Sequence, residues 1–143
     1  MDIIMVDALI HSQYVKDVGE LLNSCSGLSL TNKILHSPAC IASVKGKAVG
    51  VLCFEVGTLS TKVPMAFRKN IYVSVVAVNK WHRRQGIASE LIEFIKRYYG
   101  TFHIYITAQT DKRRWINMVG RHGFQHAFTL PDGRIAYYVI KGR

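Results

Sequence analysis

The 143-residue sequence has few cysteines, few acidic residues and no long hydrophobic run, and each shortage excludes a class of protein. No apolar stretch approaches the ~18 residues that a membrane-spanning helix needs, so no membrane segment is expected. Neither the three cysteines nor the six histidines form a zinc-finger or other metal-binding pattern, so no metal site is predicted. The cysteines, Cys25, Cys40 and Cys53, are expected to be free thiols in a reducing, cytoplasmic compartment.

Positive charge is what the sequence has in excess. Nineteen Lys and Arg residues stand against nine Asp and Glu, for a net charge of +10. Residues 79–143 carry twelve of these bases and only four of the acids. A basic surface can bind a nucleic acid, an acidic protein or membrane, or a phosphorylated cofactor. Alternatively, it only keeps the protein soluble. The other composition values, 49% apolar and 20% charged residues, predict one globular domain over residues 1–143.

Hydrophobic periodicity predicts elements in the order β-α-(α)-β-β-β-α-β-α-β-β. The expected strands are residues 3–6, 39–44, 48–56, 71–78, 102–107, 124–130 and 135–140. The expected helices are residues 12–24, a single turn at 31–36, and residues 87–99 and 111–122. This order predicts a mixed α/β (α+β) domain with a largely antiparallel start and one β-α-β crossover.

Local signals set the expected ends and faces of these elements. Ser12 and Asp111 are expected to be helix N-caps. Helical spacing puts Leu91 and Tyr98 on one apolar face of their helix. The polar stretch 57–70 is expected to be a long loop or an irregular hairpin.

The most informative segment follows the apolar strand 71–78. A basic loop, Arg83-Arg84-Gln85, leads to Gly86 and directly into a helix. Amide groups at a helix start converge and, together with the helix dipole, bind anions. Gly86 lets the backbone approach such a ligand without a Cβ in the way. A diphosphate site is therefore predicted, and because GxxxxGK[ST] and GxGxxG patterns are absent, it is neither a Walker loop nor a dinucleotide-binding loop.

The stretch Arg83-Arg84-Gln85-Gly86-Ile87-Ala88 resembles the Arg/Gln-x-x-Gly-x-Gly/Ala signature of the GNAT N-acetyltransferase superfamily. A second similarity is a strand and a helix followed by Gly123-Phe124. The resemblance implies the GNAT fold: a mostly antiparallel mixed sheet, two splayed parallel central strands and helices on both faces. It also implies acetyl-CoA as the cosubstrate.

The resemblance places the cofactor on particular residues. Backbone groups of Val76 and Val78 would pair with the pantetheine arm as an added strand does. The residues implied for the diphosphate are Arg83, Arg84, Gln85, Gly86, Ile87, Ala88 and Ser89. Lys112, with Arg113 and Arg114, would meet the CoA phosphates, although a solvated basic helix start explains these three equally well.

The sequence departs from the family where proton transfer is concerned. The tyrosine that members often use as general acid falls on Val119, and the carboxylate positions fall on Tyr72 and Thr107. The acid that remains in the central strands is Glu55, a candidate base or a plain surface carboxylate. Tyr72 is a candidate proton relay or a packed core tyrosine.

These features predict an acetyltransferase acting on a primary amine of a protein, a peptide or a small molecule, in a monomer or homodimer. One alternative is a CoA-binding protein with weak or no catalysis that serves as an interaction module, because the usual acid and base positions are missing. Another is a nucleic-acid- or ribosome-associated acetyltransferase, to which the charge points. Against nucleic acid, the sequence lacks the interleaved aromatic and basic residues of RNA-recognition motifs.

Overall fold

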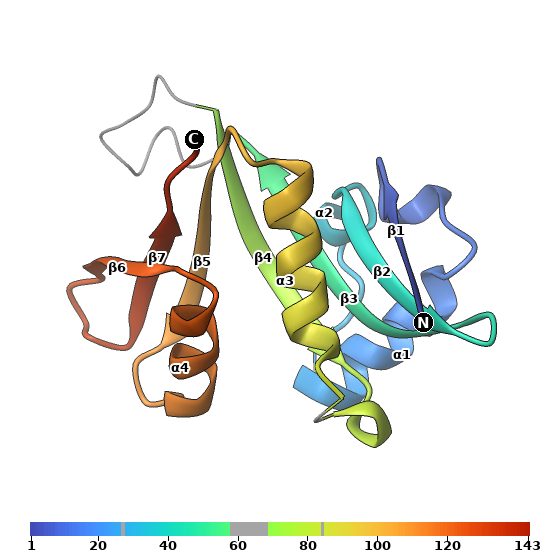
Figure 1. Cartoon of the computed structure of the whole chain (residues 1–143). Helices are drawn as coiled ribbons and strands as arrows, with labels where there is room; N and C mark the ends of the chain where they lie inside the picture. The colour runs from blue at the N-terminus through green and yellow to red at the C-terminus, as the bar shows by residue number, and fades with distance from the viewer. Residues whose placement is uncertain (27, 58–68, 84) are drawn as a thin grey trace. The chain divides into compact units, whose positions relative to one another are not determined.

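The computed structural model describes residues 1–26, 28–57, 69–83 and 85–143. Its strands form a mixed seven-stranded sheet in the order β1-β2-β3-β4-β5-β7-β6 (Figure 1). The strands are β1 (Asp2–Val6), β2 (Ala39–Val44), β3 (Lys47–Val56), β4 (Asn70–Val78), β5 (His103–Gln109), β6 (Gln125–Thr129) and β7 (Ile135–Ile140). The helical segments are η1 (Leu9–His11), α1 (Val15–Ser26), α2 (Asn32–Leu35), η3 (Lys80–His82), α3 (Ile87–Tyr98) and α4 (Arg113–Arg121). This element order confirms the predicted mixed α/β class.

The chain divides into two compact units, each with its own cluster of buried side chains. The first unit comprises Met1–Phe54 and Val75–Ile95, and the second comprises Glu55–Ser74 and Lys96–Arg143. Consequently β3, β4 and α3 each contribute residues to both units. None of the described helices is long and apolar enough to cross a membrane.

The first unit is built on an antiparallel meander. β1 pairs with β2, and β2 pairs with β3. The β2–β3 turn contains Lys45 and Gly46 with φ of 52° and 78°, because two consecutive left-handed residues match the twist of a tight hairpin. The amide of Asn79 donates to the carbonyl of Val49 at 2.8 Å, which joins the end of β4 to β3.

Helix α1 covers one face of this meander. Its apolar stripe predicts burial correctly, since Val18, Leu21 and Leu22 are at most 3% exposed. They belong to the same buried cluster as Ile41 and Val51, which are paired across β2 and β3. Alternate residues of a strand point to opposite faces, so the other face of β3 remains for a second helix.

Helix α3 packs on that other face through Gly50. A Cβ built on Gly50 would lie 2.7 Å from Cγ2 of Ile87 and 3.3 Å from Cδ1 of Leu91. Such distances leave no space for a side chain, so the absence of one lets α3 approach the strand closely. This packing fixes the N-terminal end of α3, where the predicted diphosphate site lies.

The second unit contains the parallel pair of the sheet. β4 and β5 pair from Asn70↔His103 to Val73↔Ile106, where the register ends. β7 then pairs antiparallel with both β5 and β6. Helix α4 connects β5 to β6 and buries Val119, while the indole Nε1 of Trp115 donates to the carbonyl of Thr107 at 3.0 Å. That bond ties the helix to its preceding strand.

Three local expectations are wrong. Ser12 accepts a hydrogen bond from the amide of Tyr14, but the chain first forms η1 and α1 begins later, at Val15. Asp111 does not cap α4; Lys112 occupies that position without a side-chain cap. Tyr98 is 60% exposed because α3 ends there and its ring lies past the buried stripe. Of the expected loop 57–70, residues 58–68 lie outside the described residues.

Two buried thiols of the first unit make its stability sensitive to alkaline pH. Cys40 and Cys53 are 0% exposed, and burial raises the pKa of each thiol from 9.0 to about 12. Unfolded thiols ionise near pH 9 while the folded ones stay protonated. The unfolded state therefore binds fewer protons above pH 9, and the stability contribution of these thiols is lost as pH rises.

We expect the free energy of unfolding to fall by about 1.4 kcal/mol per thiol between pH 8 and pH 10. Urea titrations at several pH values would measure this slope. The double variant Cys40→Ala/Cys53→Ala should lose that part of the slope, and Cys40→Ala alone should lose about half of it. Parallel slopes for the wild type and the double variant would contradict the assignment.

Candidate functional site

The start of α3 forms a small cavity in the first unit, which we call the anion cradle. It measures about 180 Å³ and is lined by Val78, His82, Arg83, Gly86, Ile87, Ala88 and Ser89. The first intrahelical bond runs from the amide of Glu90 to the carbonyl of Gly86 at 2.9 Å. The amides of Ile87, Ala88 and Ser89 precede that bond, so the helix itself offers them no acceptor. They are donors available to an anion.

The backbone conformation at residue 86 favours glycine. Its φ is 76°, in the left-handed region that favours glycine. A Cβ built there would meet no atom within 4 Å, so the space beside it is open. A ligand can therefore reach the helix start at this residue.

Hydrogen bonds fix the loop that leads into the cradle. The Oδ1 atom of Asn79 accepts from the amide of Trp81 at 2.9 Å and caps η3. The Nε atom of Arg83 donates to the carbonyl of Val78 at 3.4 Å, so the guanidinium lies beside the end of β4. The exposed head of Arg83 adds positive charge at the cradle, while Arg84 lies outside the described residues.

His82 carries a buried polar atom that the protein does not satisfy. Its Nδ1 atom has no hydrogen-bond partner among the described residues, although it is shielded from solvent. Buried polar atoms without a partner are uncommon, and each points to a missing ligand or water. Amide groups, a guanidinium and an imidazole are the donor set that a phosphorylated group requires, so the residues present fit a diphosphate.

A second polar group lies on one face of the sheet in the second unit, and we call it the hydroxyl network. The side chain of Tyr72 lies within hydrogen-bonding reach of the side chains of Thr107 and Tyr137. Thr107 and Tyr137 are paired across β5 and β7, so they point to the same face. The rings of Tyr72 and Tyr137 are stacked with centroids 6.0 Å apart, and Phe128 stacks on Tyr137 at 4.6 Å.

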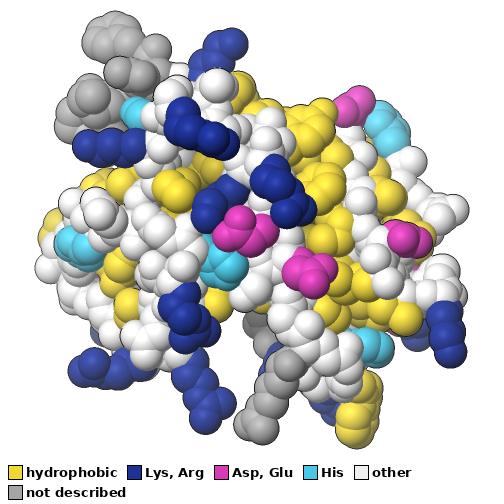
Figure 2. Space-filling view, viewed as in Figure 1, with side chains coloured by type: hydrophobic (Ala, Val, Ile, Leu, Met, Phe, Trp, Pro, Cys, Tyr) yellow, Lys and Arg dark blue, Asp and Glu magenta, His cyan; other side chains and the backbone are white. Residues whose placement is uncertain are grey.

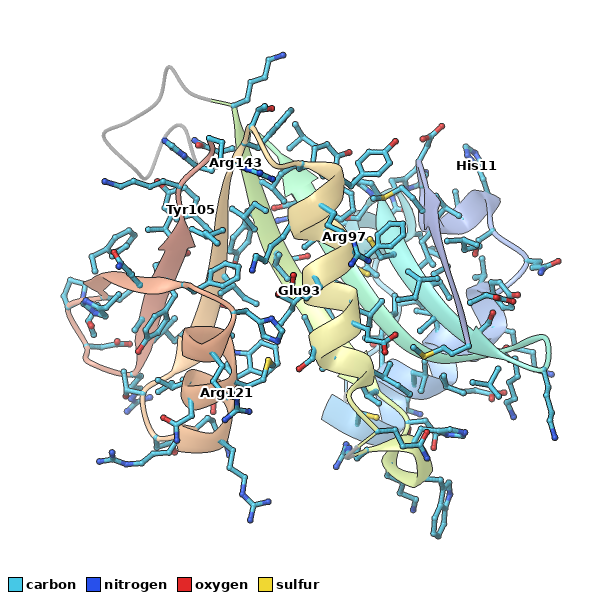
Figure 3. The ribbon with its side chains drawn as sticks, in the orientation of Figure 1. His11, Glu93, Arg97, Tyr105, Arg121 and Arg143 are labelled. Carbon is cyan, nitrogen blue, oxygen red and sulfur yellow. The ribbon has the colours of Figure 1, made fainter. Side chains whose placement is uncertain are left out.

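Burial within this network keeps Tyr72 protonated. Desolvation raises the pKa of Tyr72 above its ordinary value of 10.0, and the neighbouring Tyr137 and Glu55 raise it further. Tyr105, the register partner of Tyr72 on β5 (Figure 3), is 5% exposed, and burial raises its pKa as well. Near neutral pH Tyr72 and Tyr105 therefore carry hydroxyl protons and are not phenolates.

The two candidate proton-transfer residues predicted from the sequence, Glu55 and Tyr72, both belong to the second unit. Glu55 is half-buried on β3, close enough to act on the pKa of Tyr72. No local motif marks Tyr137, which joins them from β7. The sequence does indicate part of this network, because alternation along a strand puts Tyr105 and Thr107 on the same face of the sheet.

The remaining cofactor candidates lie on β4 and at the start of α4. Val76 and Val78 are half-buried residues of β4 and belong to the first unit. Lys112, Arg113 and Arg114 are exposed where α4 begins, in the second unit. Three bases at the positive end of a helix dipole are electrostatically unfavourable unless an anion offsets them.

The chain matches the model of the acetyltransferase (GNAT) family over residues 10–124. No curated protein sequence matches it. Its fold is similar to an N-acetyltransferase from Staphylococcus aureus Mu50, with 16% identity, a TM-score of 0.72 and 99% of both chains covered. It is also similar to the ribosomal-protein-S18-alanine N-acetyltransferase of Escherichia coli, with 14% identity, a TM-score of 0.69, and 96% of this chain and 91% of that chain covered.

A third solved structure contains ligands. It is the diaminobutyrate acetyltransferase EctA from Paenibacillus lautus in complex with L-2,4-diaminobutyric acid and coenzyme A. The identity is 19% and the TM-score 0.68, with 98% of this chain and 95% of that chain covered. At these identities the similarity concerns the fold.

Proposed function

The chain belongs to the GNAT acetyltransferase family, and from that premise we propose that it transfers the acetyl group of acetyl-CoA to a primary amine. The anion cradle is the observation that carries the proposal. It offers backbone amides at a helix start, the guanidinium of Arg83 and the unsatisfied Nδ1 of His82 in one cavity. A diphosphate would accept from the amides and the guanidinium, and also from Nδ1 of His82 in the tautomer that carries its proton there.

The cradle and β4 would hold the cofactor. The amides of Ile87, Ala88 and Ser89 would bind the diphosphate, and Arg83 would neutralise part of its charge. Backbone groups of Val76 and Val78 would orient the pantetheine arm. When bound, acetyl-CoA supplies an activated acyl group as a thioester.

The hydroxyl network would handle the protons. We infer that Glu55 accepts the proton that the amine loses, directly or through a water molecule. Tyr72 stays protonated near neutral pH, so its hydroxyl is suited to donate a proton to the departing sulfur. Thr107 and Tyr137 orient that hydroxyl through their hydrogen bonds.

A second candidate function is CoA binding with weak or no catalysis. Val119, which stands where members of the family often have the acidic tyrosine, is 0% exposed and apolar. That position contributes no proton to a reaction. The two candidates share the cofactor site and differ in whether the hydroxyl network transfers protons.

Two measurements separate these functions. Acetyl-CoA at 100 times its Kd should stabilise the protein by about 2.7 kcal/mol, which a thermal unfolding series detects. Thiol release from acetyl-CoA, measured with a panel of peptides carrying free N-termini and of small primary amines, should then exceed the amine-free rate. Stabilisation without amine-dependent thiol release would support the non-catalytic candidate. If calorimetry detects no acetyl-CoA binding, both candidates are wrong.

A further inference from the structure

Three aromatic rings cluster where α3 ends and β5 approaches, within the second unit. The centroids of Tyr98 and Tyr99 are 4.9 Å apart, and so are those of Tyr99 and Phe102. The rings are tilted or edge-on, so they present faces in different directions. Tyr98 is 60% exposed, although helical spacing predicts it on the buried face. A large exposed ring beside two others provides a surface on which a planar ligand can stack.

Basic side chains from two other segments join this cluster. The Nζ atom of Lys69 lies 5.7 Å from the ring centroid of Phe102. The amide of Arg143 donates to the carbonyl of Gly100 at 3.0 Å, and its guanidinium lies against the same residue. We call Lys69, Arg97, Tyr98, Tyr99, Phe102 and Arg143 the helix-end patch.

Backbone hydrogen bonds hold the three segments of the patch in place. The amide of His103 donates to the carbonyl of Lys69 at 3.1 Å. The amide of Gly142 donates to Nδ1 of His103 at 2.8 Å. The start of β4, the start of β5 and the C-terminal segment therefore meet at one place. The backbone segments that carry the patch residues are therefore held next to one another.

The positive charge of the chain is concentrated in the second unit. Its described residues include ten Lys and Arg against three Asp and Glu, a net of +7, whereas the first unit has six of each. Asp111 and Asp132 lie next to the end of β5 and in the β6–β7 turn, and Glu55 lies near Tyr72. The patch adjoins the His103 end of β5. Asp111 and Asp132 lie at the Gln109 end, and the strand between the two ends has seven residues and a length of about 23 Å.

Asp111 and Asp132 are therefore too far away to neutralise the patch. Glu55 lies nearer to Lys69, because the amide of Gly57 joins the end of β3 to Asn70 at 2.7 Å. Glu93, one helical turn before Arg97, offsets that residue in part. Figure 2 shows dark blue side chains beside yellow ones over the C-terminal part of α3, and Figure 3 labels Arg97 and Arg143 there. Among the described residues, neither Lys69 nor Arg143 forms an ion pair with an acid.

We propose that the helix-end patch binds single-stranded nucleic acid, with a base stacked on Tyr98 and phosphates held by Lys69, Arg97 and Arg143. Exposed aromatic rings among basic side chains are how proteins bind single strands, because each base offers a face and each nucleotide a phosphate. Duplex bases are already stacked, and an acidic protein segment gains little from the rings. The site is separate from the proposed acetyl transfer and does not depend on it.

Fluorescence anisotropy of a labelled 12-nucleotide oligouridylate tests the proposal, with the full chain and saturating acetyl-CoA present so that the anion cradle is occupied. Three phosphate contacts predict a salt slope of about −2, so raising KCl from 50 to 200 mM should weaken binding about 20-fold. Equal affinity for oligothymidylate would support the same site, with stacking and phosphate contacts as its source. An RNA duplex of equal length should bind more weakly, because its bases are stacked on one another and offer no free face to Tyr98.

Two variants separate the proposal from a general effect of charge. Lys69→Glu/Arg143→Glu should weaken binding at least tenfold, and Tyr98→Ala should weaken it about fivefold or more. The control Lys16→Glu/Lys45→Glu changes net charge equally on the first unit and should change affinity less than twofold. Melting temperatures of all variants close to that of the wild type would show that they fold.

Three results would overturn the proposal. Equal loss in the control and patch variants would mean that net charge alone attracts the oligonucleotide. Tight binding in the absence of acetyl-CoA that disappears in its presence would place the oligonucleotide in the anion cradle. Competition by polyglutamate at equal charge, with no effect of Tyr98→Ala, would identify an acidic protein as the partner. The first and third results do not bear on acetyl-CoA binding, and none of the three bears on thiol release, so the proposed function keeps its own tests.

Discussion

Replacing Gly86 with glutamate should weaken acetyl-CoA binding roughly 100-fold. The new carboxylate would enter the open space of the anion cradle, about 5 Å from the diphosphate. Repulsion at that distance costs about 3 kcal/mol at an effective dielectric constant near 20. Isothermal titration calorimetry measures the loss, and thermal stabilisation by acetyl-CoA should vanish with it.

The matched control for this variant is Gly46→Glu. Gly46 has a φ of 78°, against 76° for Gly86, and neither has an atom within 4 Å of a built Cβ. Both substitutions therefore cause the same backbone strain, of about 1–2 kcal/mol. Gly46 lies in the β2–β3 turn, so its variant should bind acetyl-CoA as the wild type does. Equal affinities of the two variants would contradict the cofactor site.

Replacing Tyr72 with phenylalanine should lower kcat about 100-fold while the Kd for acetyl-CoA stays unchanged. The substitution removes one hydroxyl and keeps the ring that stacks on Tyr137. General acid catalysis contributes about 100-fold or more, which sets the size of the effect. The rate of thiol release with the best amine of the panel measures kcat, and calorimetry measures Kd.

The pH profile distinguishes a proton donor from a packed ring. Burial holds the pKa of Tyr72 above 10.0. A reaction rate that depends on the proton of Tyr72 is therefore at its maximum at neutral pH and falls as the pH rises past 10. The Tyr72→Phe variant should lack that fall. The control is Tyr138→Phe, because Tyr138 pairs with Ile106 and so points to the other face of β7, against His126. A full rate in Tyr72→Phe would remove Tyr72 from the mechanism.

The sequence predicted the anion cradle because all of its parts are local. A strand end, a glycine at a left-handed position and a helix start follow one another within a dozen residues. Their order alone makes the amides of Ile87, Ala88 and Ser89 converge. The same local logic predicted the α1 stripe, the β2–β3 turn and the order of the elements.

The proposed proton-transfer residues were only half predicted from the sequence, because they come from four strands. Tyr72 and Glu55 were candidates from the sequence, but the hydroxyl of Tyr72 acquires its partners through strand pairing. Thr107 and Tyr137 face it because β5 pairs with β4 on one side and with β7 on the other. Pairing between distant strands has no signature in any one segment.

The sequence by itself determined the fold class, the family signature and the excess of positive charge. Tertiary structure decided where that charge lies and what stands beside it. No segment of the chain interleaves aromatic and basic residues as an RNA-recognition motif does, yet folding brings Lys69 and Arg143 to the rings of Tyr98, Tyr99 and Phe102. The physical reason is that three chain segments distant in sequence are joined there by hydrogen bonds to His103 and Gly100.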